Sequence, residues 1–546
     1  MNVFIKILVG FLFLFTPFAF AATEPWAFSI VQVGVLLAWS LVLCSRSFLY
    51  HTTLLKPILY TIGVLIFLAF VQIFFAQTIL APIPAWHPIT LMRLYTWEHL
   101  SLFITYLGVV GLVLQLYPSQ QEIKHLLEWM VICALLVSLC AVGLPRGEYI
   151  FKLTGFRGGV GPFLNRNHAG VYFAINTLLA LGLFFTKGLE FRRSMLSSKQ
   201  KQTFFLQQLS LAVIVLALGS STVMTRSRGG MLSLLVGLFA YSFLYAYAIP
   251  KQLKRRLKGV FITLIALILT TGWITTHIEE INVFAQRGTH ASEKTRRMMY
   301  RSAFRALKDY PVWGVGIGAM PVMITSYVEW NVPYYIERLH NDWLEILLGV
   351  GYLGAVFILF GLGWFVWRAL YLLKRLETRK QLLFIALLSG LIAMSTGSAV
   401  DFHFFIPANA LLFFALLGIT ASPSYSHGHV YRRSLGILHK IVILVIVGVS
   451  LYIPMQKTIA WRLALFGKGL KKEGKITAYQ KALAHYPSPR YALKLGAAYY
   501  NASLYTSDLE EKHRLKLQAH QTATAYLRKY PREKELSRLY LKARLP

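Results

Sequence analysis

Apolar residues recur along most of the chain in blocks long enough to cross a lipid bilayer, which takes about 20 residues per helix. Short polar or basic segments separate these blocks. About thirteen blocks fit membrane-spanning helices, at residues 3–20, 26–43, 58–80, 98–117, 126–143, 168–186, 207–224, 230–249, 259–276, 343–370, 381–400, 407–421 and 441–455. The pattern predicts an all-α polytopic integral membrane protein with about 12–13 transmembrane helices.

The first block is open to two interpretations. Lys6, the apolar stretch after it and Ala-Phe-Ala-Ala at 19–22 resemble a signal peptide with a small-residue cleavage site. The other interpretation is an uncleaved first span with a cytoplasmic N-terminus.

Composition supports the membrane class. Of the 546 residues, 56% are hydrophobic and only 14% are charged, whereas soluble domains carry about 25% charged residues. The net charge of +34 would suggest nucleic acid in a soluble chain. In a polytopic membrane protein it favours membrane lipids with anionic headgroups, and no nucleic-acid partner is expected. The three cysteines, Cys44, Cys133 and Cys140, lie in apolar blocks and predict no disulfide framework.

Lysine and arginine in the short loops set the orientation. With a cytoplasmic N-terminus, the inside loops hold about twenty of these residues and the short outside loops about seven. Two larger segments then lie outside, the loop 277–342 and the tail 456–546. The tail shows regular charge and Ala-rich helical periodicity, and part of it resembles a tetratricopeptide unit. We therefore expect a transmembrane domain over 1–455 and a small soluble α-helical tail over 456–546.

Several arginines break the positive-inside pattern by lying on the outside face. Arginine presents a planar fork that suits phosphate oxygens, and several forks together would bind pyrophosphate. The alternative is that each arginine reaches a lipid headgroup or pairs with a carboxylate. The candidates are Arg166, Arg226, Arg228, Arg296, Arg297 and Arg338.

Two further outside positions carry candidate chemistry. His340 stands where the large loop enters a span, and histidine near its free pKa can take a proton from a hydroxyl. Asp401 stands at another outside span end and could orient a base, bind an arginine or be a structural partner. The alternative for the turn at His340 is a helix cap formed by Asn341 or Asp342. Neither a metal-chelating carboxylate pair nor a P-loop is present in the sequence, so no metal or cofactor is expected.

Four elements in order resemble the O-antigen ligase and polymerase superfamily. One is a glycine stretch, Pro311 to Gly318, with glycines at 314, 316 and 318, followed by His340-Asn341 before a span. The others are Ser227-Arg228-Gly229-Gly230, the stretch from Gly161 to His168, and the segment from Asp401 to Ala410. The resemblance covers roughly residues 155–421.

The resemblance implies a metal-independent glycosyltransferase of the GT-C type in the bacterial inner membrane, with its active site and tail facing the periplasm. The donor would be a polyprenyl-pyrophosphate-linked glycan, and the acceptor a hydroxyl on lipid A-core, on another glycan or on a protein. The family's arginines fall on Arg228 and on Arg296 or Arg297, and its loop histidine falls on His340. Gly314, Gly316, Gly318 and Asn341 would support the site.

Three functions remain open. The first is a glycan ligase, for which a polymerase or a protein O-oligosaccharyltransferase of the same superfamily is the alternative. The second is a lipid-linked oligosaccharide flippase, which would place charge at mid-membrane and often contain internal repeats. The third is an assembly scaffold that uses the tail, although thirteen spans exceed what anchoring needs. The clustering of unusual residues on one face favours the enzyme.

Overall fold

The structure is a computed structural model that describes residues 2–44, 48–50, 54–75, 89–90, 92–143, 159–190, 197–250, 282–328, 336–425, 431–433, 436–529, 539–540 and 543. The predicted span at 259–276 lies outside this part of the chain.

Each predicted span within the described residues is a helix. The apolar helices at these positions are α1 (Asn2–Phe18), α2 (Pro25–Cys44), α3 (Leu55–Phe74), α4 (Arg93–Leu116), α5 (Gln120–Gly143), α7 (Arg166–Glu190), α8 (Ser198–Met224), α9 (Arg228–Ala248), α13 (Asp342–Arg375), α14 (Thr378–Ser398), α15 (Pro407–Thr420) and α16 (Ile437–Lys468). Ten of these are long and apolar enough to cross a membrane, and α1 and α15 are shorter apolar helices. The prediction of an all-α polytopic membrane protein is confirmed.

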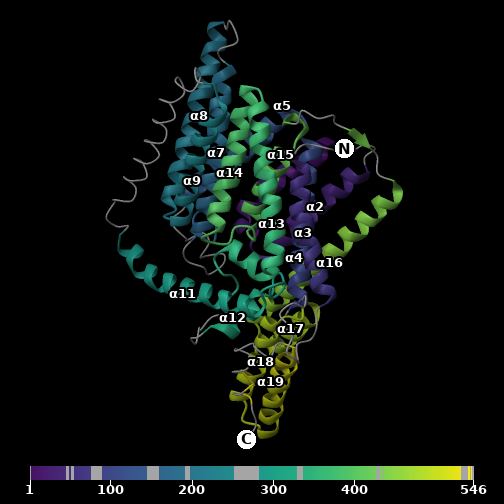
Figure 1. Ribbon diagram of the computed structural model, residues 1–546. Coiled ribbons are helices and arrows are strands. Elements are labelled where there is room, and N and C mark those ends of the chain that lie inside the picture. The colour runs from purple at the N-terminus through teal and green to yellow at the C-terminus, as the bar shows by residue number, and fades with distance from the viewer. Residues whose placement is uncertain are drawn as a thin grey trace.

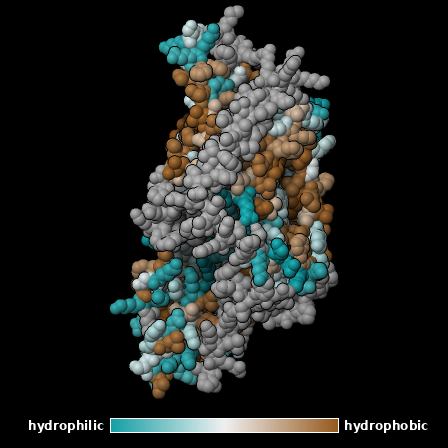
Figure 2. Space-filling model, turned by 90° about the vertical axis from the view of Figure 1, so that its left-hand side faces the viewer, coloured by the Kyte–Doolittle hydropathy of each residue, from teal (hydrophilic) through white to brown (hydrophobic). Residues whose placement is uncertain are grey.

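Helices α7 and α14 form the centre of the bundle, with 94% and 83% of their apolar windows buried. Small residues allow this close approach, since a Cβ added at Gly182 would come within 2.4 Å of the Ala386 Cβ. Helices α8 and α16 lie at the edge, each with 17% buried. Seen from the side, hydrophobic residues form a band between hydrophilic ends, as a bilayer requires (Figure 2).

The large loop and the tail build a layer beneath one end of the bundle (Figure 1). The loop contains α11 (Asn282–Asp309) and α12 (Met320–Tyr327), and the tail contains α17 (Lys472–His485), α18 (Pro489–Leu504) and α19 (Leu509–Lys529). The boundary expected at residue 456 lies inside α16, so the membrane part and the tail share one helix. The likeness to a tetratricopeptide unit stays a prediction. Two short strands, β1 (Phe48–Tyr50) and β2 (Tyr431–Arg433), pair antiparallel.

Candidate functional site

The loop between α14 and α15 carries Asp401, whose buried carboxylate joins three other segments. Its Oδ1 accepts a hydrogen bond from His340 Nδ1 at 2.7 Å, and its Oδ2 accepts one from Asn167 Nδ2 at the start of α7. From α11, Arg296 Nη2 lies 3.7 Å from Oδ2, and its Nη1 donates to the Val400 carbonyl at 3.1 Å. The structure therefore brings together three of the predicted residues, His340, Asp401 and Arg296.

Asp401 is held as an anion. Burial raises the pKa of a carboxyl group, but the hydrogen bond from His340 and the electrostatic effect of the neighbouring histidines together outweigh it and hold the pKa of Asp401 well below its usual range. The Phe402 backbone N–H adds a further hydrogen bond to Oδ1 at 2.9 Å. Because an ionised carboxylate only accepts hydrogen bonds, His340 carries its proton on Nδ1. Its Nε2 lone pair is then available as a base.

His340 occupies a constrained turn directly before α13. Its φ is +55°, in the left-handed region that histidine enters more often than most residues. The Tyr300 hydroxyl donates to the His340 carbonyl at 3.0 Å, and the imidazole ring of His340 packs edge-on against Phe402. Its side chain is 33% exposed, so the ring is both fixed and accessible. Asn341 caps α13 by accepting from the Leu344 N–H, as the alternative interpretation of this turn expected.

Buried side chains hold the Asp401 loop in place. Asp342 Oδ2 accepts from the backbone N–H groups of His403 and Phe404, at 2.6 and 2.9 Å. Asn409 Nδ2 donates to His403 Nδ1 at 3.2 Å and to the His168 carbonyl at 3.1 Å. Burial lowers the pKa of His403 to about 4, so its ring is neutral at neutral pH. This cluster supports the loop.

The Arg226–Arg228 turn lies against the same loop. A Cβ added at Gly229 would come within 3.0 Å of the Val400 side chain. Arg228 is exposed at the first position of α9, and Arg226 is partly buried with a φ of +54°. The turn and Arg296 therefore flank one loop, although they come from different segments.

Gly230 serves helix packing and leaves no room for a ligand at its Cα. A Cβ on Gly230 would come within 2.8 Å of the Gly170 Cα, so α7 fills that space. Ser227 begins α9 by accepting from the Gly230 N–H at 3.0 Å. These small residues serve close packing of α7 and α9.

The remaining arginines differ in their surroundings. Arg297 is exposed, whereas its neighbour Arg296 lies beside Asp401. Arg166 is exposed beside Asn167. Arg338 is not turned to Asp401: its Nη1 lies 2.7 Å from the buried Glu345 Oε1 and its guanidinium stacks on Phe405 at 3.8 Å. Its fork is thus engaged within the protein, which favours the carboxylate-pairing alternative.

The glycines of the stretch from Pro311 to Gly318 allow close backbone packing. Gly314, Gly316 and Gly318 have φ values of 71°, 100° and 79°, which L-residues with side chains rarely adopt. A Cβ on Gly314 would lie 2.3 Å from the Leu348 carbonyl oxygen, and one on Gly318 would lie 2.3 Å from His99 Nδ1. The stretch therefore packs closely against α13 and α4.

Sequence reasoning missed Gln72 and the role of Asn167. Gln72 donates to the carbonyls of Trp313 and Gly349 and accepts from the Ile317 N–H at 2.9 Å, which ties α3 to the glycine stretch. The signal was present for both: Gln72 is a polar residue inside an apolar block, and such residues are costly and tend to be functional. Asn167 lies beside Arg166 in one of the four elements.

The bundle and its outer cluster define a polytopic membrane protein with a histidine–carboxylate pair and arginines at one end. Residues 212–359 match the family model described as O-Antigen ligase. The match supports the resemblance to the O-antigen ligase superfamily over this segment and, at the family level, O-antigen ligase-like polysaccharide biosynthesis. It includes Arg228, Arg296 and His340, whereas Asn167 and Asp401 lie outside it. No curated protein matches the chain.

Proposed function

We propose that the protein transfers a glycan from a polyprenyl-pyrophosphate donor to an acceptor hydroxyl at the periplasmic face of the bacterial inner membrane. The observation that carries the proposal is the 2.7 Å hydrogen bond between His340 and Asp401, with Arg296 beside it. The match of residues 212–359 to the O-antigen ligase family supports it.

In this reaction His340 acts as the general base and Asp401 orients it. His340 Nε2 takes the proton of the acceptor hydroxyl while that oxygen bonds to the anomeric carbon of the donor sugar. The bond from that carbon to the phosphate oxygen breaks, and its electron pair leaves with the polyprenyl pyrophosphate. Asp401 stabilises the imidazolium that forms.

Arg228 and Arg296 stabilise the leaving pyrophosphate. Guanidinium groups form paired, charge-assisted hydrogen bonds with phosphate oxygens, and such preorganised charge stabilises a transition state strongly. We therefore propose a metal-independent reaction. The proposed acceptor is a sugar hydroxyl on lipid A-core, and a second lipid-linked glycan or a protein hydroxyl would make the enzyme a polymerase or a protein O-oligosaccharyltransferase.

The test is transfer from a purified donor in EDTA, with lipid A-core, the donor itself and a protein offered as acceptors. Wild type should form product, His340→Ala should not, and His439→Ala, which changes an exposed histidine on α16, should match wild type. Normal transfer by His340→Ala would remove it as the base. Absence of product from wild type, with movement of the donor across the vesicle membrane, would favour a flippase.

A further inference from the structure

The C-terminal half of α11 has an exposed cationic face. Arg301, Phe304, Arg305 and Lys308 are exposed and follow the spacing i, i+3, i+4 and i+7, which places them on one side of the helix. The Phe304 side chain is 51% exposed. The residues between them are buried, namely Ser302, Ala303, Ala306 and Leu307. This half of α11 therefore packs its apolar side on the protein and presents three cations around one aromatic ring.

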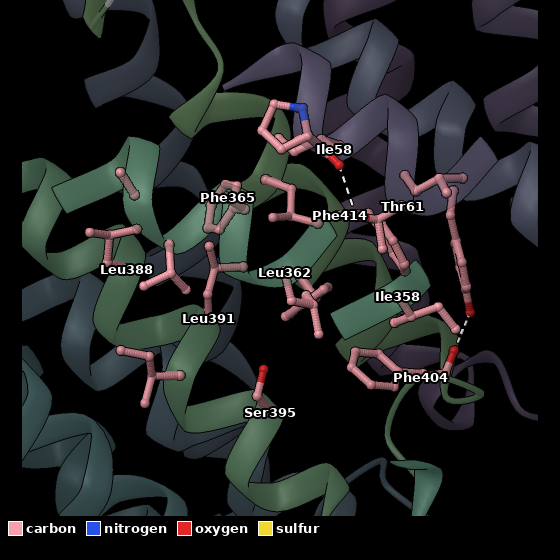
Figure 3. Close-up of a pocket in the computed structure, with 18 of the residues that line it drawn as sticks. Ile58, Thr61, Ile358, Leu362, Phe365, Leu388, Leu391, Ser395, Phe404 and Phe414 are labelled. Carbon is pink, nitrogen blue, oxygen red and sulfur yellow. Dashed lines mark hydrogen bonds between the residues drawn. The ribbon is translucent and has the colours of Figure 1, made fainter. Parts of the chain in front are cut away.

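The middle of α11 lies at the end of the spanning helices. Arg296 lies beside Asp401, and Tyr300, one turn later, donates to the His340 carbonyl directly before α13 begins. The loop of Asp401 also carries Phe404, which lines an apolar cavity between α3, α13, α14 and α15. Figure 3 shows Phe404 at one end of this cavity. The apolar interior of the bundle thus begins directly behind the residues that α11 contacts.

The chain that follows α11 lies beside α13. The Pro311 carbonyl accepts from the Tyr352 N–H at 2.8 Å, and the Tyr352 side chain is 54% exposed. Helix α13 has 34 residues, about 51 Å at 1.5 Å per residue, so it exceeds the hydrocarbon thickness of about 30 Å by roughly 10 Å at each end. Tyr352 lies about 15 Å along α13 from Asp342, which is close to the hydrocarbon boundary. The end of α11 is therefore held near the headgroup level.

The direction and charge of α11 suit a membrane surface. Figure 1 shows α11 running across the end of the bundle toward α12, whereas the spanning helices run along it. Helices that lie in the membrane interface carry lysine and arginine with exposed aromatic or apolar residues. Asp309 is the only acidic residue from 294 to 309, and its carboxylate accepts a hydrogen bond from the Tyr327 hydroxyl. Charge complementarity therefore favours an anionic surface.

We propose that Arg301, Arg305 and Lys308 bind the headgroups of anionic phospholipids at the bilayer surface, with Phe304 between them in the interfacial region. Lipid binding by this face does not depend on the function proposed above. Its consequence for catalysis does rest on that function: because Arg296 is on the same helix, an anionic membrane holds it at the level of Asp401. Transfer is then sensitive to the phospholipid composition of the membrane.

The first test measures hydrogen exchange of residues 294–309 in nanodiscs of phosphatidylcholine, with and without phosphatidylglycerol. Wild type should exchange more slowly with phosphatidylglycerol, by roughly tenfold or more, because each basic residue near an anionic surface favours binding. High salt should remove the difference. Replacing Arg301, Arg305 and Lys308 together by Gln should also remove it. The matched control replaces exposed cations of the tail by Gln and should behave as wild type; these are Lys471, Lys481 and Arg514.

Equal exchange of wild type in the two bilayers, or the same loss in the control variant, would overturn the proposal. Protection by a soluble acidic oligosaccharide and not by phosphatidylglycerol would assign the face to a glycan instead. A variant with Lys at both Arg301 and Arg305 keeps the charge and should keep the difference. The alternative role of these cations, stabilising the C-terminus of α11, would lower the Tm of the Gln variant without changing its response to lipid.

Transfer in the same nanodiscs tests the consequence for catalysis. Wild type should transfer several-fold faster with phosphatidylglycerol, and the Gln variant at the same rate in both bilayers. Equal wild-type rates despite slower exchange would contradict the link to Arg296. If wild type transfers in neither bilayer, the proposed function fails, whereas the exchange measurement still tests lipid binding.

Discussion

Asn167 and Asp401 lie 234 residues apart, and the amide of Asn167 donates a hydrogen bond to the carboxylate of Asp401. The other carboxylate oxygen accepts from His340. Asp401 is therefore fixed from two sides and cannot rotate without losing a donor. We therefore expect Asn167 to position His340 through Asp401.

Asn167→Asp should lower transfer by roughly tenfold or more, because a second carboxylate raises the pKa of Asp401. The native pKa of Asp401 is depressed, so its carboxylate persists far into the acid range and is lost only as the pH falls through that pKa. The variant should lose activity at a higher pH. A pH profile of kcat/KM checks this, and a lower but unshifted profile would contradict the link to Asp401.

Arg296→Ala should reduce transfer on the order of a hundredfold, the effect of removing one preorganised charge from an active site. Arg297→Ala is its matched control, since the residue is adjacent and exposed, and its activity should stay close to wild type. Kinetics at saturating donor would separate the two. Equal losses would mean that the charge of α11 matters and not the contact with Asp401.

Arg228→Lys tests whether geometry or charge is required beside the Val400 loop. Lysine keeps the positive charge but cannot form the paired hydrogen bonds of a guanidinium. We expect a clear loss of transfer and a raised KM for the donor. Wild-type kinetics in this variant would indicate that Arg228 only anchors the protein to headgroups.

Arg338→Ala should act on stability. It would leave Glu345, whose side chain is only 4% exposed, without its ion-pair partner, at a cost of about 2 kcal/mol. Thermal unfolding in detergent measures the loss, with Arg166→Ala as an exposed control. An unchanged Tm combined with lost transfer would return Arg338 to the pyrophosphate site.

Gly318→Ala should destabilise the protein by about 1–3 kcal/mol from its positive φ alone, and further through the contact with His99. Gly363→Ala on α13 is the control, because a Cβ there meets nothing within 4 Å. Equal Tm values for the two variants would show that close packing at the glycine stretch does not contribute to stability.

Hydropathy located the spans because each helix must satisfy its own backbone groups in lipid. Residue type and predicted side also selected His340, Asp401 and the arginines. Sequence could not show which of these meet, because His340 and Asp401 lie 61 positions apart, with the helices α13 and α14 between them, and the packing of these helices decides the contact. The same limit hid the pairing of Arg338 with Glu345 and the filling of the space at Gly230.

Helix α16 has 32 residues, about 48 Å at 1.5 Å per residue, so it exceeds the hydrocarbon thickness of about 30 Å. Lys457 of α16 also pairs with Glu98 of α4 at 3.0 Å, and Arg490 of α18 pairs with Glu337, three residues before His340. The continuous helix and these two ion pairs therefore hold the tail at a fixed distance from the membrane part, unlike a domain on a flexible linker. If an acceptor binds to the tail, we expect this fixed distance to limit which of its hydroxyls can reach His340.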